Sequence, residues 1–172
     1  MNASTAGTAG TEDPAGPFLY FGYGSSLDGE RLRAICPSAR LVSIARLPGH
    51  RLAFSIESKR TWRGGVADMQ PAAGEEIWGA LWLIDAAGSR PLDEHEGLFR
   101  DPPAYRRTTV EVTTPAGDVV RCRSYAVVDP DPAGFLPSPP FKRTLVRGAR
   151  ALGLPAAYIA RLEALPDNGR TA

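Results

Sequence analysis

The segment Leu92-Asp93-Glu94-His95-Glu96-Gly97 supplies three carboxylates within four residues, enough for general acid/base chemistry. Consecutive side chains on a helix point about 100° apart, so the three cannot all face one pocket. Glu96 directly precedes a glycine at the expected helix end, where its side chain can turn inward. We therefore take Glu96 as the candidate acid/base, against the simpler interpretation of a solvated helix face. Because adjacent helix residues diverge, we expect His95 to lie at the surface.

A second candidate feature is the segment Gly22-Tyr23-Gly24-Ser25-Ser26-Leu27, which follows an aromatic run. A strand that enters a glycine turn and then a helix start directs several backbone N–H groups at one point, which suits an anion or a developing oxyanion. The segment begins like a dinucleotide-binding fingerprint, but Leu27 occupies the position of the third glycine and no βαβ unit follows. A tight turn that binds no ligand is the alternative interpretation.

The composition predicts one globular domain that works without a metal. A chain of 172 residues can bury a core without disulfides, and its hydrophobic fraction of 43% is ordinary for a globular protein. The formal net charge is +1, from 20 basic and 19 acidic residues, which is not the pattern of a nucleic-acid-binding protein. Two cysteines make no disulfide framework, and two histidines without nearby second ligands make no metal site. We expect no cofactor and no nucleic-acid partner.

The two ends of the chain are predicted to lie outside the folded domain. Residues 1–16 contain no basic residue, so they lack the positive start of a secretory signal and are expected to form a disordered leader. Residues 17–166 then form the domain, and residues 167–172 form a polar tail. Because no apolar stretch approaches the roughly 18 residues of a membrane span, we expect a cytoplasmic protein without a membrane partner.

Strand and helix patterns together favour an α+β fold. Alternating apolar residues and turn signals at Pro48-Gly49 and Pro115-Ala116-Gly117 predict strands over residues 18–23, 39–47, 50–58, 65–69, 76–84, 105–114 and 118–128. Helical spacing predicts helices over residues 27–35, 89–95, 140–152 and 156–165, the first capped by Ser25 or Ser26. Residues 59–65 are predicted to form an exposed basic loop. Because helices do not alternate with strands, we predict a compact single domain around a strongly bent, barrel-like mixed β-sheet with a few flanking helices.

Seven motifs occur in one order along residues 18–165. They are Phe18-Leu19-Tyr20-Phe21-Gly22-Tyr23-Gly24-Ser25-Ser26-Leu27, Trp62-Arg63-Gly64-Gly65-Val66-Ala67, Glu76-Ile77-Trp78-Gly79-Ala80-Leu81-Trp82, Leu92-Asp93-Glu94-His95-Glu96-Gly97, Cys122-Arg123-Ser124-Tyr125, Pro137-Ser138-Pro139-Pro140-Phe141-Lys142 and Gly153-Leu154-Pro155. The first resembles the YGSNL signature that opens the γ-glutamylcyclotransferase family, whose fold is also called AIG2-like. The next three are similar to its W-x-G-G-[IV]-A, E-V-W-G-x-x-W and L-D-E-x-E-G motifs.

The resemblance implies an activity and a set of site residues. Family members cleave a γ-glutamyl amide by turning the α-amine of the glutamyl group onto its own γ-carbonyl, which gives 5-oxoproline and a free amine without a cofactor. By motif, Glu96 would be the acid/base. The glutamyl group would be held by the backbone of the loop Tyr23, Gly24, Ser25, Ser26 and Leu27, and Tyr105 and Tyr125 would line the pocket. The expected partner is a small γ-glutamyl compound, and a homodimer is left open.

Two positions depart from the family pattern. Ser26 stands where the family usually has Asn, and Phe141 stands where a tyrosine is common. Either change could alter which compound is accepted, a γ-glutamyl amino acid or a γ-glutamyl-protected amine. The alternative function is a catalytically inactive module of the same fold that binds a small ligand.

Overall fold

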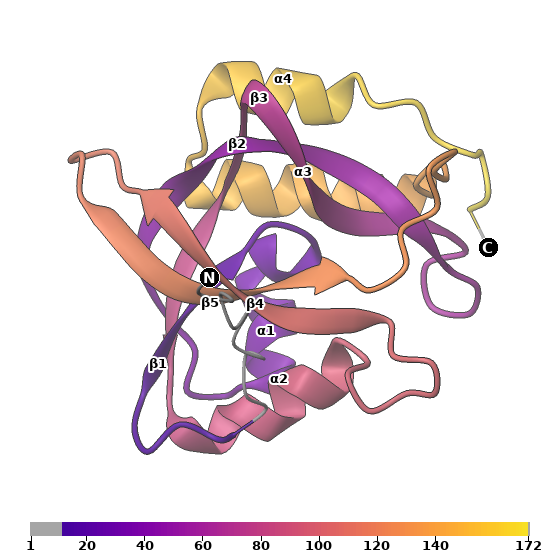
Figure 1. The fold of residues 1–172 in the computed structure, drawn as a ribbon. Coiled ribbons are helices and arrows are strands. Elements are labelled where there is room, and N and C mark those ends of the chain that lie inside the picture. Colours follow the sequence, from indigo (N-terminus) through magenta and orange to yellow (C-terminus); the bar gives the residue numbers. More distant parts are fainter. Residues whose placement is uncertain (1–11, 172) are drawn as a thin grey trace, which may run out of the picture.

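Five strands close into a barrel in the computed structural model, which describes residues 12–171 (Figure 1). They are β1 (Phe18–Gly22), β2 (Arg40–Ser58), β3 (Gly64–Ile84), β4 (Tyr105–Thr113) and β5 (Val119–Val127). Their order around the barrel is β1-β3-β2-β4-β5, and all neighbours are antiparallel except β1 and β5, which are parallel. The predicted α+β fold with a barrel-like mixed sheet is confirmed.

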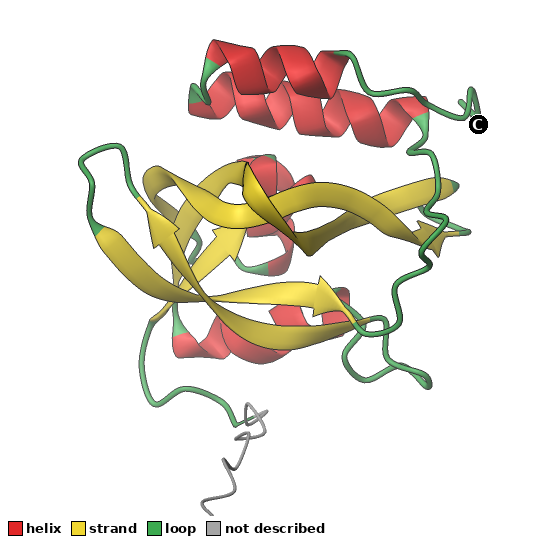
Figure 2. Cartoon of the chain, turned by 45° about the horizontal axis from the view of Figure 1, so that its top comes forward, coloured by secondary structure: helices red, strands yellow, loops and turns green. Residues whose placement is uncertain are grey.

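Helices lie on two sides of this barrel (Figure 2). They are the α-helices α1 (Gly29–Ile35), α2 (Ser89–His95), α3 (Pro139–Leu152) and α4 (Ala156–Glu163), with two short 3₁₀ turns η1 (Ser25–Leu27) and η2 (Ala86–Gly88). Helices α3 and α4 run side by side against one side, and α2 lies on the opposite side. No helix of residues 12–171 is long and apolar enough to cross a membrane.

Strand β1 separates two hydrophobic clusters. Its residues Phe21 and Leu19 pack with the cluster under α3 and α4, whereas Tyr20 and Phe18 pack with the cluster next to α1 and α2. This alternation is the period of two expected for a strand that is buried on both faces. As a result, the side chain of Tyr20 points towards the same side of the barrel as α2.

Strands β2 and β3 are longer than the sequence predicted. The turn expected at Pro48-Gly49 is wrong, because the chain continues through that point as a bulge, with a register shift between Pro48 and His50. The two strands predicted over residues 65–69 and 76–84 are likewise joined in β3. A bulge explains both errors, since it accommodates a proline without an N–H group and a glycine with positive φ inside a strand.

The first helix also begins later than predicted. Residues 25–27 form η1, and α1 starts after Asp28, whose side chain accepts a hydrogen bond from the Glu30 N–H at 3.1 Å. Asp28 therefore caps the helix in place of Ser25 or Ser26, which leaves both serine hydroxyls free for other contacts.

The ends of the chain are described in part. Residues 1–11 of the predicted leader lie outside the described residues, and the backbone oxygen of Glu12 accepts a hydrogen bond from Arg107 at 2.9 Å. In the predicted tail, the Asn168 N–H donates to the Pro137 carbonyl at 3.0 Å. The tail therefore contacts the segment that leads into α3.

Candidate active site

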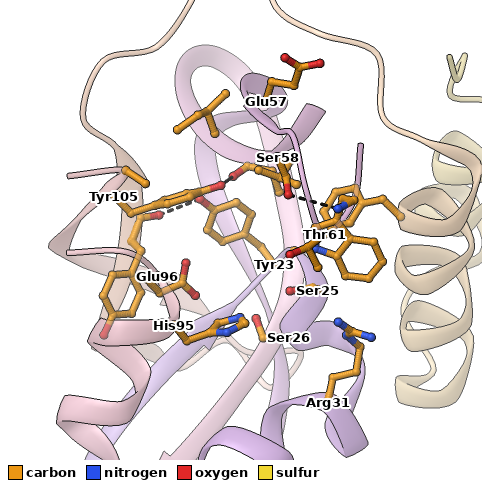
Figure 3. Close-up of a pocket in the computed structure, with 18 of the residues that line it drawn as sticks. Tyr23, Ser25, Ser26, Arg31, Glu57, Ser58, Thr61, His95, Glu96 and Tyr105 are labelled. Atoms are coloured by element: carbon orange, nitrogen blue, oxygen red, sulfur yellow. Dashed lines mark hydrogen bonds between the residues drawn. The ribbon is translucent and has the colours of Figure 1, made fainter. Parts of the chain in front are cut away.

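A pocket of about 650 Å³ opens between the η1 loop, the end of α2 and the loop that joins β2 to β3 (Figure 3). It brings together seven of the eight predicted site residues, namely Tyr23, Gly24, Ser25, Ser26, Glu96, Tyr105 and Tyr125. The eighth, Leu27, does not line the pocket; it is buried in the core. Its N–H group donates to the Gly24 carbonyl at 3.0 Å, so neither its side chain nor its amide reaches the pocket.

Glu96 enters the pocket from the end of α2. The helix stops at His95, and Gly97 follows Glu96 with φ of +75°, a conformation that glycine adopts without strain. The Glu96 Oε1 atom accepts a hydrogen bond from the Tyr20 hydroxyl at 3.5 Å. Burial raises the pKa of Glu96 to about 7, a shift that the Tyr20 hydrogen bond opposes and the nearby Asp93 carboxylate reinforces. A carboxyl with this pKa can both accept and donate a proton near neutral pH.

The other two carboxylates of the acidic segment point elsewhere. Asp93 is 1% exposed and accepts hydrogen bonds from Arg107 Nε at 2.8 Å and from the Tyr125 hydroxyl at 2.7 Å. A second guanidinium nitrogen of Arg107 also contacts this carboxylate. Glu94 is exposed and pairs with Arg90 at 3.1 Å. The three acids therefore do not share one pocket: Asp93 is in a buried ion pair, Glu94 is in solvent and Glu96 is in the pocket.

The η1 loop is held in place by close packing against α3. A Cβ atom on Gly148 of α3 would lie 2.6 Å from the carbonyl carbon of Leu27, so only glycine allows this approach. The first N–H groups of a helical turn have no partner within the turn, and in η1 these belong to Ser25 and Ser26. The Ser26 hydroxyl lies 2.9 Å from the Tyr20 hydroxyl, which connects the loop to Glu96. The backbone donors of the loop and the Glu96 carboxyl thus lie in one pocket.

The three tyrosines of the predicted site contribute rings more than free hydroxyl protons. Tyr105 donates to the Ala67 carbonyl at 2.5 Å, and Tyr23 donates to the Tyr125 carbonyl at 2.7 Å. The hydroxyl of Tyr125 is already engaged with Asp93. Burial, and then the Glu96 carboxylate, raises the pKa of Tyr105 well above its usual value, so this phenol stays protonated. Within residues 12–171, no group of three or more His, Cys, Asp or Glu side chains is arranged to hold a metal ion.

Comparison with known proteins identifies the family. Residues 76–162 match the AIG2-like family. The γ-glutamylcyclotransferase of Homo sapiens is 36% identical over 170 residues, which cover 95% of this chain and 88% of that protein. The chain belongs to the γ-glutamylcyclotransferase family. The Bos taurus γ-glutamylcyclotransferase is 35% identical over 154 residues, or 88% of this chain and 80% of that protein.

A solved structure described as γ-glutamyl cyclotransferase superposes on this family member with a TM-score of 0.85 at 34% identity, covering 91% of this chain and 92% of that one. The family resemblance and the prediction that the chain is an enzyme of the γ-glutamylcyclotransferase type are therefore confirmed.

Several pocket residues of this γ-glutamylcyclotransferase family member were not predicted. The sequence pattern places Tyr20 only in a buried strand. Side chains along β1 alternate between its two faces, and Tyr20 lies on the face towards Glu96. His95 lies at the surface, as predicted, but its ring also lines the pocket. Partial desolvation there, followed by the charges of Arg31 and Arg100, lowers its pKa. Arg31 reaches the pocket from α1 and lies over Trp62, a residue of the loop that was expected to be merely exposed. A helical projection of α1 assigns Arg31 to one face of that helix. The contact with Trp62 cannot be read from the sequence, because barrel closure brings the loop between β2 and β3 next to α1.

Proposed function

We propose that this protein cleaves a γ-glutamyl amide by intramolecular attack of the substrate's α-amine on its γ-carbonyl, and that Glu96 moves the protons. The observation that carries the proposal is the placement of the Glu96 carboxyl in the same pocket as the η1 loop, where burial raises its pKa to about 7. An ordinary exposed glutamate would be ionised at neutral pH and a weak proton donor. A carboxyl that titrates near 7 is matched to a reaction that needs a base first and an acid afterwards.

The reaction requires proton transfers through one group. The α-ammonium group of the substrate gives a proton to the Glu96 carboxylate, and the resulting amine attacks the γ-carbonyl carbon to form the new C–N bond. The tetrahedral intermediate then collapses with cleavage of the original amide C–N bond as Glu96 gives its proton to the departing nitrogen. The Glu96 carboxylate next takes the second proton of the ring nitrogen, and this proton leaves with the released amine as its ammonium form. The products are 5-oxoproline and a free amine, so no water or cofactor is consumed.

The pocket contributes orientation and charge stabilisation. Formation of a five-membered ring needs the folded-back rotamer of the glutamyl chain, and good orientation of this kind can contribute about 7–11 kcal/mol to the rate. The η1 N–H groups of Ser25 and Ser26 are suitable donors for the substrate α-carboxylate or for the oxyanion, where one donor contributes about 3–4 kcal/mol. The rings of Tyr23 and Tyr105 restrict the space around the glutamyl chain.

The experiment measures 5-oxoproline released from a panel of γ-glutamyl amino acids and γ-glutamyl amines. Wild type should release it, and Glu96→Gln should reduce the rate by at least about 100-fold, because an amide cannot exchange the proton. Glu94→Gln is the matched control. Glu94 lies two residues before Glu96, is exposed and, among residues 12–171, pairs with Arg90 alone, so this variant should keep the wild-type rate. Equal rates for wild type and Glu96→Gln would refute the role of Glu96. If wild type releases no 5-oxoproline from any compound, the inactive binding module becomes the better description.

A further inference from the structure

Cationic side chains predominate around the pocket. Arg31, Lys59, Arg60 and Arg100 line it, against the two acids Glu57 and Glu96. In the described part of the chain, none of the four cations has a carboxylate within 4.0 Å. Glu57 already has a cationic partner in Arg170, at 3.8 Å. The pocket of a chain with a net charge of only +1 is therefore locally positive and attracts anions.

Arg31 is the cation of this set that the fold holds most firmly. It lies in the first turn of α1, which Asp28 caps and Arg147 of α3 ties down through the same carboxylate. Its guanidinium carbon lies 4.4 Å from the centroid of the Trp62 ring. That ring is itself fixed by an edge contact with Phe141, at a centroid distance of 4.9 Å.

A guanidinium held over an indole by cation–π attraction keeps N–H donors free for another partner. These donors match the two oxygens of a carboxylate. Lys59 and Arg60 are exposed on the adjoining loop, and within residues 12–171 their side chains make no hydrogen bond, ion pair or aromatic contact. Arg31 is thus the pre-oriented anion-binding group of the pocket.

Arg31 also lies on the side of the pocket away from Glu96. In Figure 3, Glu96 and Tyr105 face the pocket from one side, Arg31 faces it from the other, and Ser25 and Ser26 lie between them. If the glutamyl group occupies the space next to Ser25 and Glu96, Arg31 borders the part of the pocket that remains for the leaving amine. Arg100 is on the Glu96 side, since its charge lowers the pKa of that carboxyl.

We propose that Arg31, stacked on Trp62, binds a carboxylate carried by the leaving amine and so selects γ-glutamyl amino acids over γ-glutamyl amines that lack this group. The inference rests on the proposed function and assigns its specificity to one side chain. A γ-glutamyl amino acid carries a net charge of −1, because the α-amine and α-carboxylate of the glutamyl group cancel. A γ-glutamyl amine without the second carboxylate has no net charge, so it gains nothing from a cation at this position.

The test compares two substrates that differ in this carboxylate alone, γ-glutamyl-alanine and γ-glutamyl-ethylamide, in wild type and Arg31→Gln. We expect kcat/KM for γ-glutamyl-alanine to fall roughly 10- to 100-fold in Arg31→Gln, the range for losing hydrogen bonds to a charged group. The value for γ-glutamyl-ethylamide should change less than about threefold. Arg31→Lys should keep part of the preference, because the charge remains while the bidentate fork is lost. Thermal melting of each variant verifies that it is folded.

Arg33→Gln is the matched control. Arg33 lies on the same helix and also packs over a tryptophan, with its guanidinium carbon 5.4 Å from the Trp82 centroid, but it does not line the pocket. This variant should leave the ratio of the two kcat/KM values unchanged.

An equal loss for both substrates in Arg31→Gln would overturn the inference, because it would place Arg31 on the glutamyl α-carboxylate that both substrates share. If Arg31→Gln changes kcat/KM for neither substrate, the inference is overturned as well. Either result leaves the proposed function intact, whereas failure of wild type to form 5-oxoproline from either compound removes the function and this inference together.

Discussion

Replacing Glu96 by glutamine is expected to stabilise the folded chain at pH 8 while it lowers activity by at least about 100-fold. The folded-state pKa of this carboxyl is raised to about 7 from 4.5, mainly by burial. A raised pKa means that the folded state binds the proton more tightly than the unfolded state. Glu96 therefore costs little stability below its unfolded pKa, and the cost grows as the pH rises through about 7. Glutamine is uncharged at every pH, so it does not pay this penalty.

The magnitude follows from the shift. Each pKa unit corresponds to about 1.4 kcal/mol, so a shift from 4.5 to about 7 gives an upper bound of about 3–4 kcal/mol at pH 8. Glu96 is partly exposed, and solvent screening reduces the expected gain to about 2 kcal/mol. In a chain of this size that gain raises Tm by about 4–8 °C. At pH 4 the two variants should differ by less than about 0.5 kcal/mol, because the carboxyl is then protonated in the folded state and largely protonated in the unfolded one.

The assay is thermal unfolding followed by circular dichroism between pH 4 and pH 8, for wild type, Glu96→Gln and the exposed control Glu94→Gln. The difference in Tm between Glu96→Gln and wild type should grow with pH, while the control should show no such trend. In parallel, kcat/KM of wild type should rise with pH through about 7, as the base form of Glu96 becomes populated. A difference in Tm that is the same at pH 4 and pH 8 would refute the reasoning, because Glu96 would then have an ordinary pKa.

Two further substitutions test the groups around Glu96. Tyr20→Phe removes the hydroxyl that donates to Glu96 at 3.5 Å and lowers its pKa, so the rising limb of the pH–rate profile should move to higher pH; an unmoved limb would show that this contact does not act on Glu96. Asp93→Asn breaks the buried pair with Arg107 and should lower the free energy of unfolding by about 3 kcal/mol, measured by urea denaturation. A loss below about 1 kcal/mol would mean that this pair does not anchor α2.

The parts of the fold that sequence predicted are those determined by neighbouring residues. The hairpin of β4 and β5 and the helices α2 and α3 were placed within one residue of their ends, because alternation, helical spacing, a turn glycine and a proline at a helix start are all local signals. The continuous strands β2 and β3 were not, because Pro48 and Gly49 signal a turn locally and only the closing barrel makes them a bulge.

The candidate site divides in the same way. The inward orientation of Glu96 followed from its position before Gly97, a property of one helix end. The contacts of Arg31 with Trp62 and of Tyr20 with Ser26 join segments that only the tertiary structure brings together. No spacing along the chain reports such contacts. Leu27 differs from the rest of its motif, because its N–H group is bonded to the Gly24 carbonyl and its side chain supports the loop from the core.

Asp93 in α2 and Glu96 at the C-terminal end of that helix lie three residues apart, and this pair explains how the fold keeps Glu96 in an unfavourable setting. A partly buried carboxyl could relieve its desolvation by turning its helix outward, and α2 is only seven residues long. Asp93 prevents this, because its ion pair with Arg107 and its hydrogen bond from Tyr125 attach α2 to strands β4 and β5. Asp93 therefore stabilises the fold and fixes the position of α2. Glu96 destabilises the fold at neutral pH and is held in the pocket by that fixed position. On this argument the acidic segment needs both residues, Asp93 for the geometry and Glu96 for the proton transfers.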